Sequence, residues 1–581
     1  MPKEKKWISE DYLKLWEKFD QREFESEEAA KLLKSLNLIG DEKSINQVLV
    51  ELKKLDLIEA IPNPKDSRKV FYRLKPLIKT EILTREELIA TLKKAADIIR
   101  TRVSYEFILV LLFLKRLSDK WELEYRKTVE ALKKEGLSEE EAKEEAKKPE
   151  WHEGFDIPEE FLWENIRKET ERLPEKLSEV MKGLATRNPD LKNIFERVDF
   201  AQFASNSENK EILRQLIEVF SEKKLEEVSP DILGDAYEWI LSYFAPQKAK
   251  EGEVYTPREV IRLIVEILDP QPKDSIYDPA CGSGGMLITS YKYVEEKYKE
   301  TKELSLFGQE VNPLTLALCK MNLILHGIND YYLENGDTLL YPRFKENGYI
   351  KQFDICLTNP PWNQDGYGED TLQKAELNKK RFSYGFPPRQ SADWAWIQHL
   401  LASTKETGKA AIVIDNGCLF RGGKEKAIRA KFIENDLIEC VILLPEKLFY
   451  NTGAPGAIII FNKNKPAERK NKILFINASK EFIPHPSVKR FNSLSKENIN
   501  KIAEAYRKFD NIAGFSVVVD TKKIAENDFN LNVTLYVTPI EEEEPIDVVQ
   551  EFSELKTLEK EREEIDRKIE EYLTELGKVL K

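Results

Sequence analysis

The sequence predicts a doubly wound α/β sheet in the second half of the chain, preceded by a helical region. Between residues 255 and 465, short β-branched runs alternate with amphipathic helical segments, which is typical of a mostly parallel sheet. From 84 to 245 the apolar residues recur at helical spacing instead. At 581 residues the chain is also too long for one hydrophobic core, so several domains are expected.

Charge and cysteine content narrow the functional classes. The chain carries 104 acidic and 91 basic residues, a net charge of −13. A protein that grips DNA unaided usually has a basic balance, so action on nucleic acid would require another subunit for much of the phosphate contact. The five cysteines are widely spaced and the four histidines scattered, which predicts neither disulfides nor a metal site. The N-terminus lacks an apolar signal core, so we expect a cytoplasmic protein that makes no membrane contact.

Residues 1–80 form the first predicted domain. Three helical patterns precede two strand-like runs around the turn PNPKD, an order that resembles a winged helix-turn-helix. Lys65, Arg68 and Lys69 would lie on the wing and could contact DNA. A protein-docking module with a solvated wing explains the same pattern equally well.

Residues 81–248 form a predicted helical domain. The run FILVLLFL (107–114) is about half as long as a membrane span and therefore predicts a buried helix. The polar stretch 131–154 has few large apolar residues, so it predicts an exposed helix pair or a mobile insertion.

The sheet domain is assigned to residues 249–465, with 466–540 as its C-terminal extension and 541–581 as a helix for subunit assembly. Apolar residues in that last segment follow a three-four spacing, as in a coiled coil or helix bundle. They are Leu555, Leu558, Ile565, Ile569, Tyr572, Leu576 and Val579. A helix folded back on its own protomer is the alternative.

A glycine-rich turn follows the first predicted strand, in DPACGSGGM (278–286). Gly282, Gly284 and Gly285 let the backbone approach a ligand, and the next helix offers free N–H groups to a carboxylate. The loop fits neither the dinucleotide-binding pattern GxGxxG nor the phosphate-binding pattern GxxxxGK[ST]. Because Asp278 precedes the glycines, we expect a ligand that carries an ammonium as well as a carboxylate.

Two further acids end the next predicted strands. Glu310, in LFGQEVNP, can accept hydrogen bonds from both hydroxyls of a ribose. Asp337, in ENGDTL, can accept one from an exocyclic amine of adenine. Together with Asp278 they favour an adenosine-containing ligand at the carboxyl ends of the strands.

The fourth strand ends in CLTNPPWN (356–363), where two prolines stiffen the loop and remove two backbone donors. The side-chain carbonyl of Asn359 and the backbone carbonyl of Pro360 can accept hydrogen bonds from one amino group, which makes its nitrogen more nucleophilic. Trp362 offers a face on which a base taken out of the duplex could stack. This chemistry requires neither a metal nor an ionised general base.

DPACGSGG, GQEVNP, NGD and NPPW, in this order, resemble the motifs of amino-group DNA methyltransferases that use S-adenosylmethionine. Asn at the first position of NPPW favours adenine N6, whereas cytosine N4 enzymes usually carry Ser there. More narrowly, the chain is similar to the modification subunits of Type I restriction–modification systems. That likeness spans residues 84–581 and rests on GEVYTPREVIRLIV (252–265), TREELIATLKKAADIIR (84–100), FLKRLSDKWE (113–122) and DFNLNVTLYV (528–537).

The resemblance implies a Rossmann-like methyltransferase sheet and a set of site residues. The catalytic and base-binding loop would be Asn359, Pro360, Pro361 and Trp362, although the family often has Phe or Tyr at the last position. The residues that would hold S-adenosyl-L-methionine are Glu253, Tyr255, Thr256, Pro257, Arg258, Asp278, Cys281, Gly282, Ser283, Gly284, Gly285, Glu310 and Asp337.

The resemblance also implies partners. These are double-stranded DNA, a specificity (S) subunit that chooses the target, an ATP-driven restriction (R) subunit, and a second copy of the chain that shares one specificity subunit with the first. One alternative is a stand-alone adenine methyltransferase, or one from another phage-defence system. It would need its own target-recognition domain, and residues 466–537 are too short for one. A DNA- or partner-binding scaffold is the non-enzymatic alternative, and it leaves the three strand-end acids without a purpose.

Overall fold

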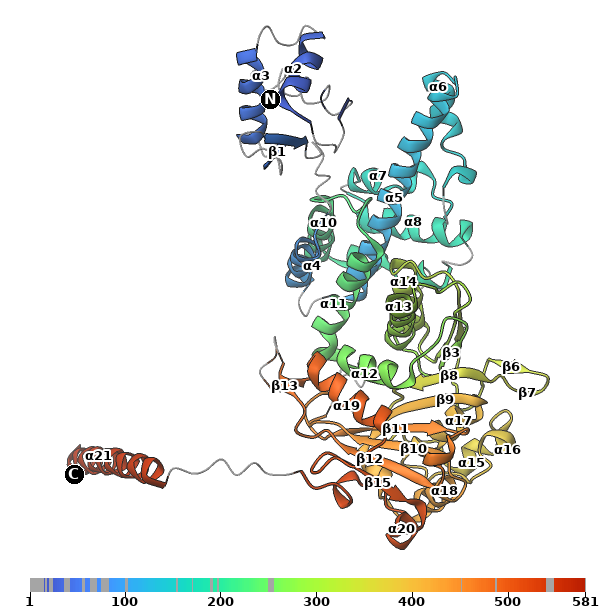
Figure 1. Ribbon diagram of the computed structural model, residues 1–581, viewed down its shortest axis with the longest axis vertical. Coiled ribbons are helices and arrows are strands. Elements are labelled where there is room, and N and C mark those ends of the chain that lie inside the picture. Colours follow the sequence, from blue (N-terminus) through green and yellow to red (C-terminus); the bar gives the residue numbers. More distant parts are fainter. Residues whose placement is uncertain are drawn as a thin grey trace.

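The structure is a computed structural model with a small N-terminal module, a helical region, a large sheet domain and a C-terminal helix (Figure 1). The described residues are 15, 18–19, 24–35, 42–54, 58–62, 70–74, 83–99, 103–152, 155–169, 171–188, 192–195, 198–248, 255–450, 452–485, 488, 490–539 and 548–579.

The N-terminal module has a hydrophobic core of its own, built around Leu33, Leu49 and Leu52. Its described elements are α2 (Ser26–Ser35), α3 (Glu42–Lys54) and an antiparallel hairpin of β1 (Ile58–Pro62) and β2 (Val70–Leu74). The proposed wing residues Lys65, Arg68 and Lys69 lie outside the described residues.

The helical region follows, as the sequence predicts. Its long central helix is α5, and the run 107–114 within α5 is buried at every position. The α-helices are α4 (Arg85–Ile99), α5 (Glu106–Lys134), α6 (Glu139–Glu145), α7 (Trp163–Arg167), α8 (Leu173–Arg187), α9 (Lys192–Phe195), α10 (Ser207–Ser221) and α11 (Pro230–Lys248). Within the described part of the chain, no helix is long and apolar enough to cross a membrane.

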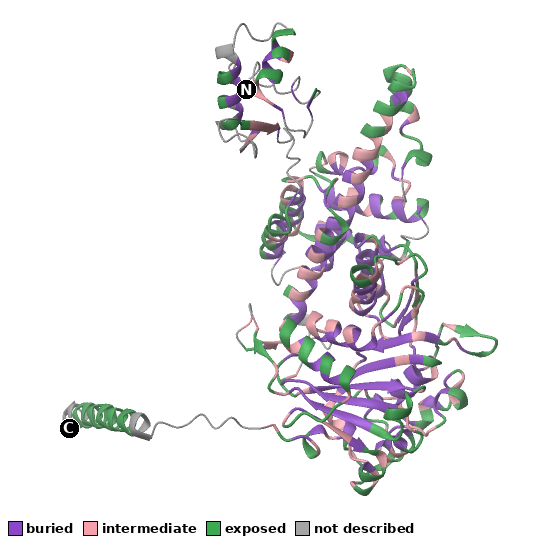
Figure 2. Cartoon of the chain, viewed as in Figure 1, coloured by how far each residue is buried: buried purple, intermediate pink, exposed green. Residues whose placement is uncertain are grey.

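The polar stretch from residue 131 belongs to the exposed end of this region (Figure 2). The last turns of α5 pair with α6 there through Leu132, Ala142 and Ala146. Ser138 and Glu141 form a capping box that starts α6. Of the two predictions for this stretch, the structure supports the exposed helix pair.

A nine-stranded sheet of order β15-β12-β10-β11-β9-β8-β3-β4-β5 forms the second half of the chain. β11 runs antiparallel to both of its neighbours and β15 is an antiparallel edge, while the remaining neighbours pair in parallel. The strands are β3 (Ser275–Asp278), β4 (Ser305–Glu310), β5 (Tyr331–Asn335), β8 (Phe353–Thr358), β9 (Thr404–Asp415), β10 (Ile438–Leu443), β11 (Gly456–Asn462), β12 (Lys472–Asn477) and β15 (Ser516–Asp520).

Strand order reverses between β3 and β8. From β3 the chain proceeds through β4 to the edge strand β5 and then returns to place β8 on the other side of β3. In doubly wound sheets ligands bind beside such a reversal, at the carboxyl ends of the strands. The glycine turn and the NPPW loop follow β3 and β8, so both lie at this point.

Helices cover both faces of the sheet (Figures 1 and 2). Two separate apolar clusters fill the two interfaces, because the side chains of each strand alternate between the faces. On one face lie α12 (Arg258–Leu268), α13 (Gly285–Tyr298), α14 (Pro313–Leu325) and α19 (Lys496–Lys508). On the other lie α17 (Asp393–Ala402), α18 (Gly423–Glu434) and α20 (Thr521–Glu526).

The helical region and the sheet domain share a core through α14. Ala317, Leu318 and Met321 of this helix belong to the same buried cluster as the helical region. The Tyr237 hydroxyl of α11 also donates a hydrogen bond to the Leu318 carbonyl, at 2.8 Å. This packing fixes α11 next to the glycine turn.

The C-terminal helix α21 (Val548–Val579) contrasts with this packing (Figure 1). Every described side chain from 552 to 573 is exposed. Leu558 is 57% exposed, Ile565 56% and Ile569 49%, so the part of the predicted seam whose side chains are described lies in solvent. The structure therefore does not support a helix folded back on its own protomer.

Candidate functional site

The glycine turn after β3 depends on backbone conformations that glycine allows. Gly282 has φ 53° and Gly284 has φ 86°. A Cβ on Gly284 would lie 2.8 Å from the Cys319 sulfur of α14, so a larger residue would collide there. Gly284 also precedes the first turn of α13, whose N–H groups point into the turn.

Asp278 ends β3 and is 2% exposed. Its Oδ1 accepts hydrogen bonds from the Ala280 amide at 3.0 Å and from the Thr358 hydroxyl of β8 at 2.7 Å. Burial, with a smaller contribution from the neighbouring Glu310, raises the pKa of this carboxyl to about 7 despite those bonds. A ligand cation placed here would restore the ionised form.

Glu310 ends β4 and turns toward the glycine turn. Its two carboxylate oxygens accept from the Gly282 amide at 3.1 Å and from the Asn312 amide at 2.8 Å. The carboxylate is thereby held beside the glycines by groups that belong to two different loops.

Asp337 is placed differently from the other two acids. Its carboxylate accepts hydrogen bonds from the Tyr367 hydroxyl at 2.7 Å and from the Leu340 amide at 3.1 Å. It does not line the cavities described below, so its contact with an adenine ring stays a prediction.

Tyr255, Thr256 and Pro257 form the entry to α12, opposite the NPPW loop. Thr256 accepts a hydrogen bond from the Asn359 side chain, at 2.8 Å from Nδ2 to Oγ1. Arg258 pairs with two acids of α11, Asp235 and Glu238. These carboxylates raise the pKa of the Arg258 guanidinium, although burial works against them. Glu253 lies outside the described residues.

Asn359 begins the loop after β8 and is 8% exposed. Its Oδ1 accepts a hydrogen bond from the indole Nε1 of Trp362, at 2.9 Å. The Trp362 ring meets Phe449 edge-on, with 4.8 Å between the ring centroids and 67° between the planes. Beyond the loop, the Asn363 amide donates to Asp393 at 2.9 Å and so anchors its end to α17.

Two adjoining cavities, of about 60 and 260 Å³, join the glycine turn to this loop. Predicted residues that line one or both are Tyr255, Thr256, Arg258, Asp278, Cys281, Gly282, Ser283, Gly285, Glu310, Asn359 and Pro361. Pro257, Gly284, Pro360 and Trp362 support the same loops without lining either cavity.

The helical region adds residues that the sequence did not predict for this site, namely Tyr105, Glu238, Leu241 and Ala245. No local motif marks them. Glu238, Leu241 and Ala245 reach the cavities only through the packing of α11 on α14, and Tyr105, which precedes α5, stacks on Phe244 of α11. Phe449 and Tyr450 were also missed. They follow β10, and Tyr450 lies 5.9 Å from Tyr255 between ring centroids. Aromatic residues after a predicted strand could have drawn attention to them.

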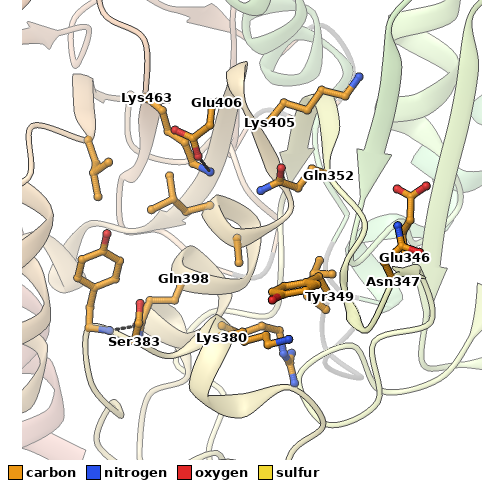
Figure 3. Close-up of a pocket in the computed structure, with 16 residues that line it drawn as sticks. Glu346, Asn347, Tyr349, Gln352, Lys380, Ser383, Gln398, Lys405, Glu406 and Lys463 are labelled. Atoms are coloured by element: carbon orange, nitrogen blue, oxygen red, sulfur yellow. Dashed lines mark hydrogen bonds and ion pairs between the residues drawn. The ribbon is translucent and has the colours of Figure 1, made fainter.

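A pocket of about 730 Å³ lies at the opposite ends of the strands (Figure 3). Its lysines are already bonded within the chain: Lys405 to Asp354, Lys463 to Glu406 and the Thr404 carbonyl, and Lys380 to the Gly348 carbonyl. Lining residues such as Gln352 and Lys405 stand at the amino ends of β8 and β9. The pocket is therefore remote from the acids and glycines of the site.

The site can hold a cationic, nucleotide-like ligand against Asp278 and Glu310, and it can present two carbonyl acceptors to an amine. Among the described residues, no group of histidines, cysteines and acids could hold a metal ion. The fold is of the doubly wound α/β class, and the site lies at the strand ends where enzymes of that class bind their ligands.

Comparison with known proteins narrows that class. The N-6 DNA methylase family matches residues 228–545, and the HsdM N-terminal domain matches 88–220. The chain belongs to the N-6 DNA methylases and, within them, to the methylase subunits of Type I restriction enzymes. The predicted resemblance is thereby confirmed.

Two of the relatives from Methanocaldococcus jannaschii match nearly the whole chain. The Type I restriction enzyme MjaVIII methylase subunit is 46% identical over 98% of this chain and 97% of its own length. The MjaVII methylase subunit is 44% identical over 96% of both chains. Among solved structures, the Type I restriction-modification methyltransferase subunit from Streptococcus thermophilus superposes with a TM-score of 0.68. It is 28% identical and covers 79% of this chain and 100% of its own.

Proposed function

We propose that this chain transfers a methyl group from S-adenosyl-L-methionine to the N6 amino group of adenine in double-stranded DNA. One observation carries the proposal: Asn359, the glycine turn and Glu310 line the same cavity of about 260 Å³. A cofactor held on the turn would therefore lie next to the carbonyls that accept the target amine.

The residues present fit the cofactor's charges. Asp278 is a buried carboxyl with a raised pKa, which a ligand ammonium would stabilise as a carboxylate. Glu310 would accept from the ribose hydroxyls, and the first N–H groups of α13 would meet the cofactor's carboxylate. When bound, the cofactor supplies an electrophilic methyl group on a sulfonium.

The NPPW loop would position the amine. Asn359 Oδ1 and the Pro360 carbonyl each accept one N–H of the amino group, which turns the nitrogen lone pair toward the cavity. Pro360 and Pro361 supply no N–H that could compete for these acceptors. After transfer the amine is cationic and acidic, so its proton can leave to solvent without an ionised general base.

The target base must leave the duplex to reach this loop. The Trp362 indole, Phe449 and the pair of Tyr255 and Tyr450 surround the loop with aromatic rings. Aromatic faces stabilise an unstacked base, so we infer that it enters on this side.

Assembly would supply what the chain lacks. We infer that a specificity subunit selects the DNA sequence and that a restriction subunit joins for cleavage. A second copy of the chain would complete a complex of two modification subunits and one specificity subunit. The exposed seam of α21 supports a helix-bundle contact with such partners, because an isolated helix that exposes so many apolar residues gains stability only by packing. The net charge of −13 supports a partner that contributes much of the DNA contact.

Transfer of labelled methyl from S-adenosylmethionine to DNA tests the proposal. The chain would be assayed alone and with the specificity subunit encoded beside it, and the modified base identified. We expect N6-methyladenine only with the partner. Activity by the chain alone would favour a stand-alone methyltransferase, and the absence of cofactor binding would favour the scaffold alternative.

A further inference from the structure

We propose that Trp362 is a positioning residue whose indole N–H sets the orientation of the Asn359 amide. This inference rests on the proposed role of Asn359 as an acceptor for the target amine. It assigns Trp362 a task besides offering a ring face to a base.

Both ends of the Asn359 side-chain amide are hydrogen-bonded. Its Oδ1 accepts from Trp362 Nε1 at 2.9 Å, and its Nδ2 donates to Thr256 Oγ1 at 2.8 Å. A hydroxyl can donate or accept, so Thr256 would tolerate either orientation of the amide. An indole N–H can only donate, so it favours the orientation in which the amide oxygen faces it. In the other orientation two N–H groups would face each other and repel.

Packing holds the indole where it can act in this way. A Cβ added to Gly456 would lie 2.9 Å from Cη2 of Trp362 and 2.8 Å from Phe449, so β11 begins with the one residue that leaves room for the ring. Phe449 meets the same ring edge-on at 4.8 Å. The donor is therefore held against Asn359 by groups from β11 and from the loop after β10.

The orientation matters for the reaction because an amide has unlike ends. The carbonyl oxygen has two lone pairs, so it can accept from Trp362 and still accept from the target amine. A flipped amide would present its own N–H groups to the amine, and two donors repel. Phe or Tyr, which the family often carries here, has no N–H at this point, so the constraint belongs to chains with Trp.

The test removes the N–H and keeps an aromatic ring. Trp362→Phe, in the complex with the specificity subunit, should lower the single-turnover methylation rate about 10- to 100-fold, as a misplaced reacting group does. The dissociation constant for S-adenosylmethionine and the KM for DNA should stay within about twofold of their wild-type values, which corresponds to a few tenths of a kcal/mol. Fluorescence of 2-aminopurine at the target position should still report base extrusion.

A second variant covers the possibility that Phe disturbs the packing. Replacement of Trp362 by 3-benzothienylalanine keeps the shape of the indole and exchanges only the N–H for sulfur, and it should lower the rate to the same extent. The matched control is Trp396→Phe. Trp396 is buried, whereas Trp362 is half-buried, and the Trp396 Nε1 likewise donates to an amide oxygen, that of Gln364, at 3.1 Å. This control should keep the wild-type rate.

An unchanged rate in the benzothienyl variant overturns the inference, as does an equal loss in Trp396→Phe, which would indicate a general loosening of the loop. Neither outcome affects the proposed function, which the methyl-transfer assay of the wild-type complex tests separately.

Discussion

The candidate functional site and the C-terminal helix use their side chains in opposite ways. Around the site, polar groups are bonded to segments far away in the chain, such as Thr358 to Asp278 and Asn359 to Thr256. Along α21, the described side chains from 552 to 573 all face solvent. The site is thus preorganised within one chain, whereas α21 has a surface suited to a partner. The contrast suggests that chemistry and assembly can be disrupted separately.

The largest effect is expected from Asn359→Ala. Loss of the side-chain carbonyl removes an acceptor aimed at the target amine, and such losses cost about 10²- to 10³-fold or more in rate. Methyl transfer should fall to the limit of a labelled-methyl assay, while isothermal titration still detects cofactor binding. Asn435→Ala, an exposed asparagine at the end of α18, is the control. Near-normal turnover by Asn359→Ala would rule out the acceptor role.

Removal of residues 545–581 should disrupt subunit assembly and leave the cofactor site intact. Co-purification with the specificity subunit should be lost because the apolar seam is gone, while S-adenosylmethionine affinity is retained. Ile565→Glu is a sharper test, because it places a charge on the seam. The control is Ser553→Glu, which adds the same charge to the same helix away from the seam. If the truncated chain assembles normally, α21 is not the assembly helix.

Glu310→Ala should weaken cofactor affinity by about 100-fold, since hydrogen bonds to a charged group contribute about 1.5–3 kcal/mol. The same change removes the acceptor to which the Gly282 and Asn312 amides donate in the wild-type chain. Glu310→Gln keeps an acceptor and should show a smaller loss. Equal affinities for Glu310→Ala and wild type in calorimetry would place the ribose elsewhere.

The smallest effect concerns pH. The pKa of Asp278 is about 7 in the cofactor-free chain, so the carboxyl takes up a proton as the pH falls through 7. Binding of a cationic ligand must then displace that proton, so cofactor affinity should fall by up to about tenfold for each pH unit below 7 and level off above it. Titrations of wild type and Asp278→Asn across this range provide the measurement. A wild-type profile as flat as that of the variant would contradict the role of Asp278.

Much of the sheet could be predicted from local sequence. Each strand predicted between residues 255 and 465 is present, because most of them are buried, continuous apolar runs bounded by turn residues. β12 and β15 were not predicted as parts of the sheet, since residues 466–540 were assigned only as an extension of the domain. β12 pairs with β10 on one side and with the edge strand β15 on the other, and no local pattern encodes which strand becomes a neighbour.

The sequence by itself determined the chemistry-bearing turns. The glycines, the two prolines and the acids act through backbone conformation and charge at adjacent positions, so their meaning is local. Only the tertiary structure decided how these turns meet. It brought Glu238 of α11 to the cavity beside the glycine turn, bonded Asp337 to Tyr367, and set Trp362 against Asn359, Phe449 and Gly456. Such contacts depend on packing between segments far apart in the chain, which local residue patterns do not specify.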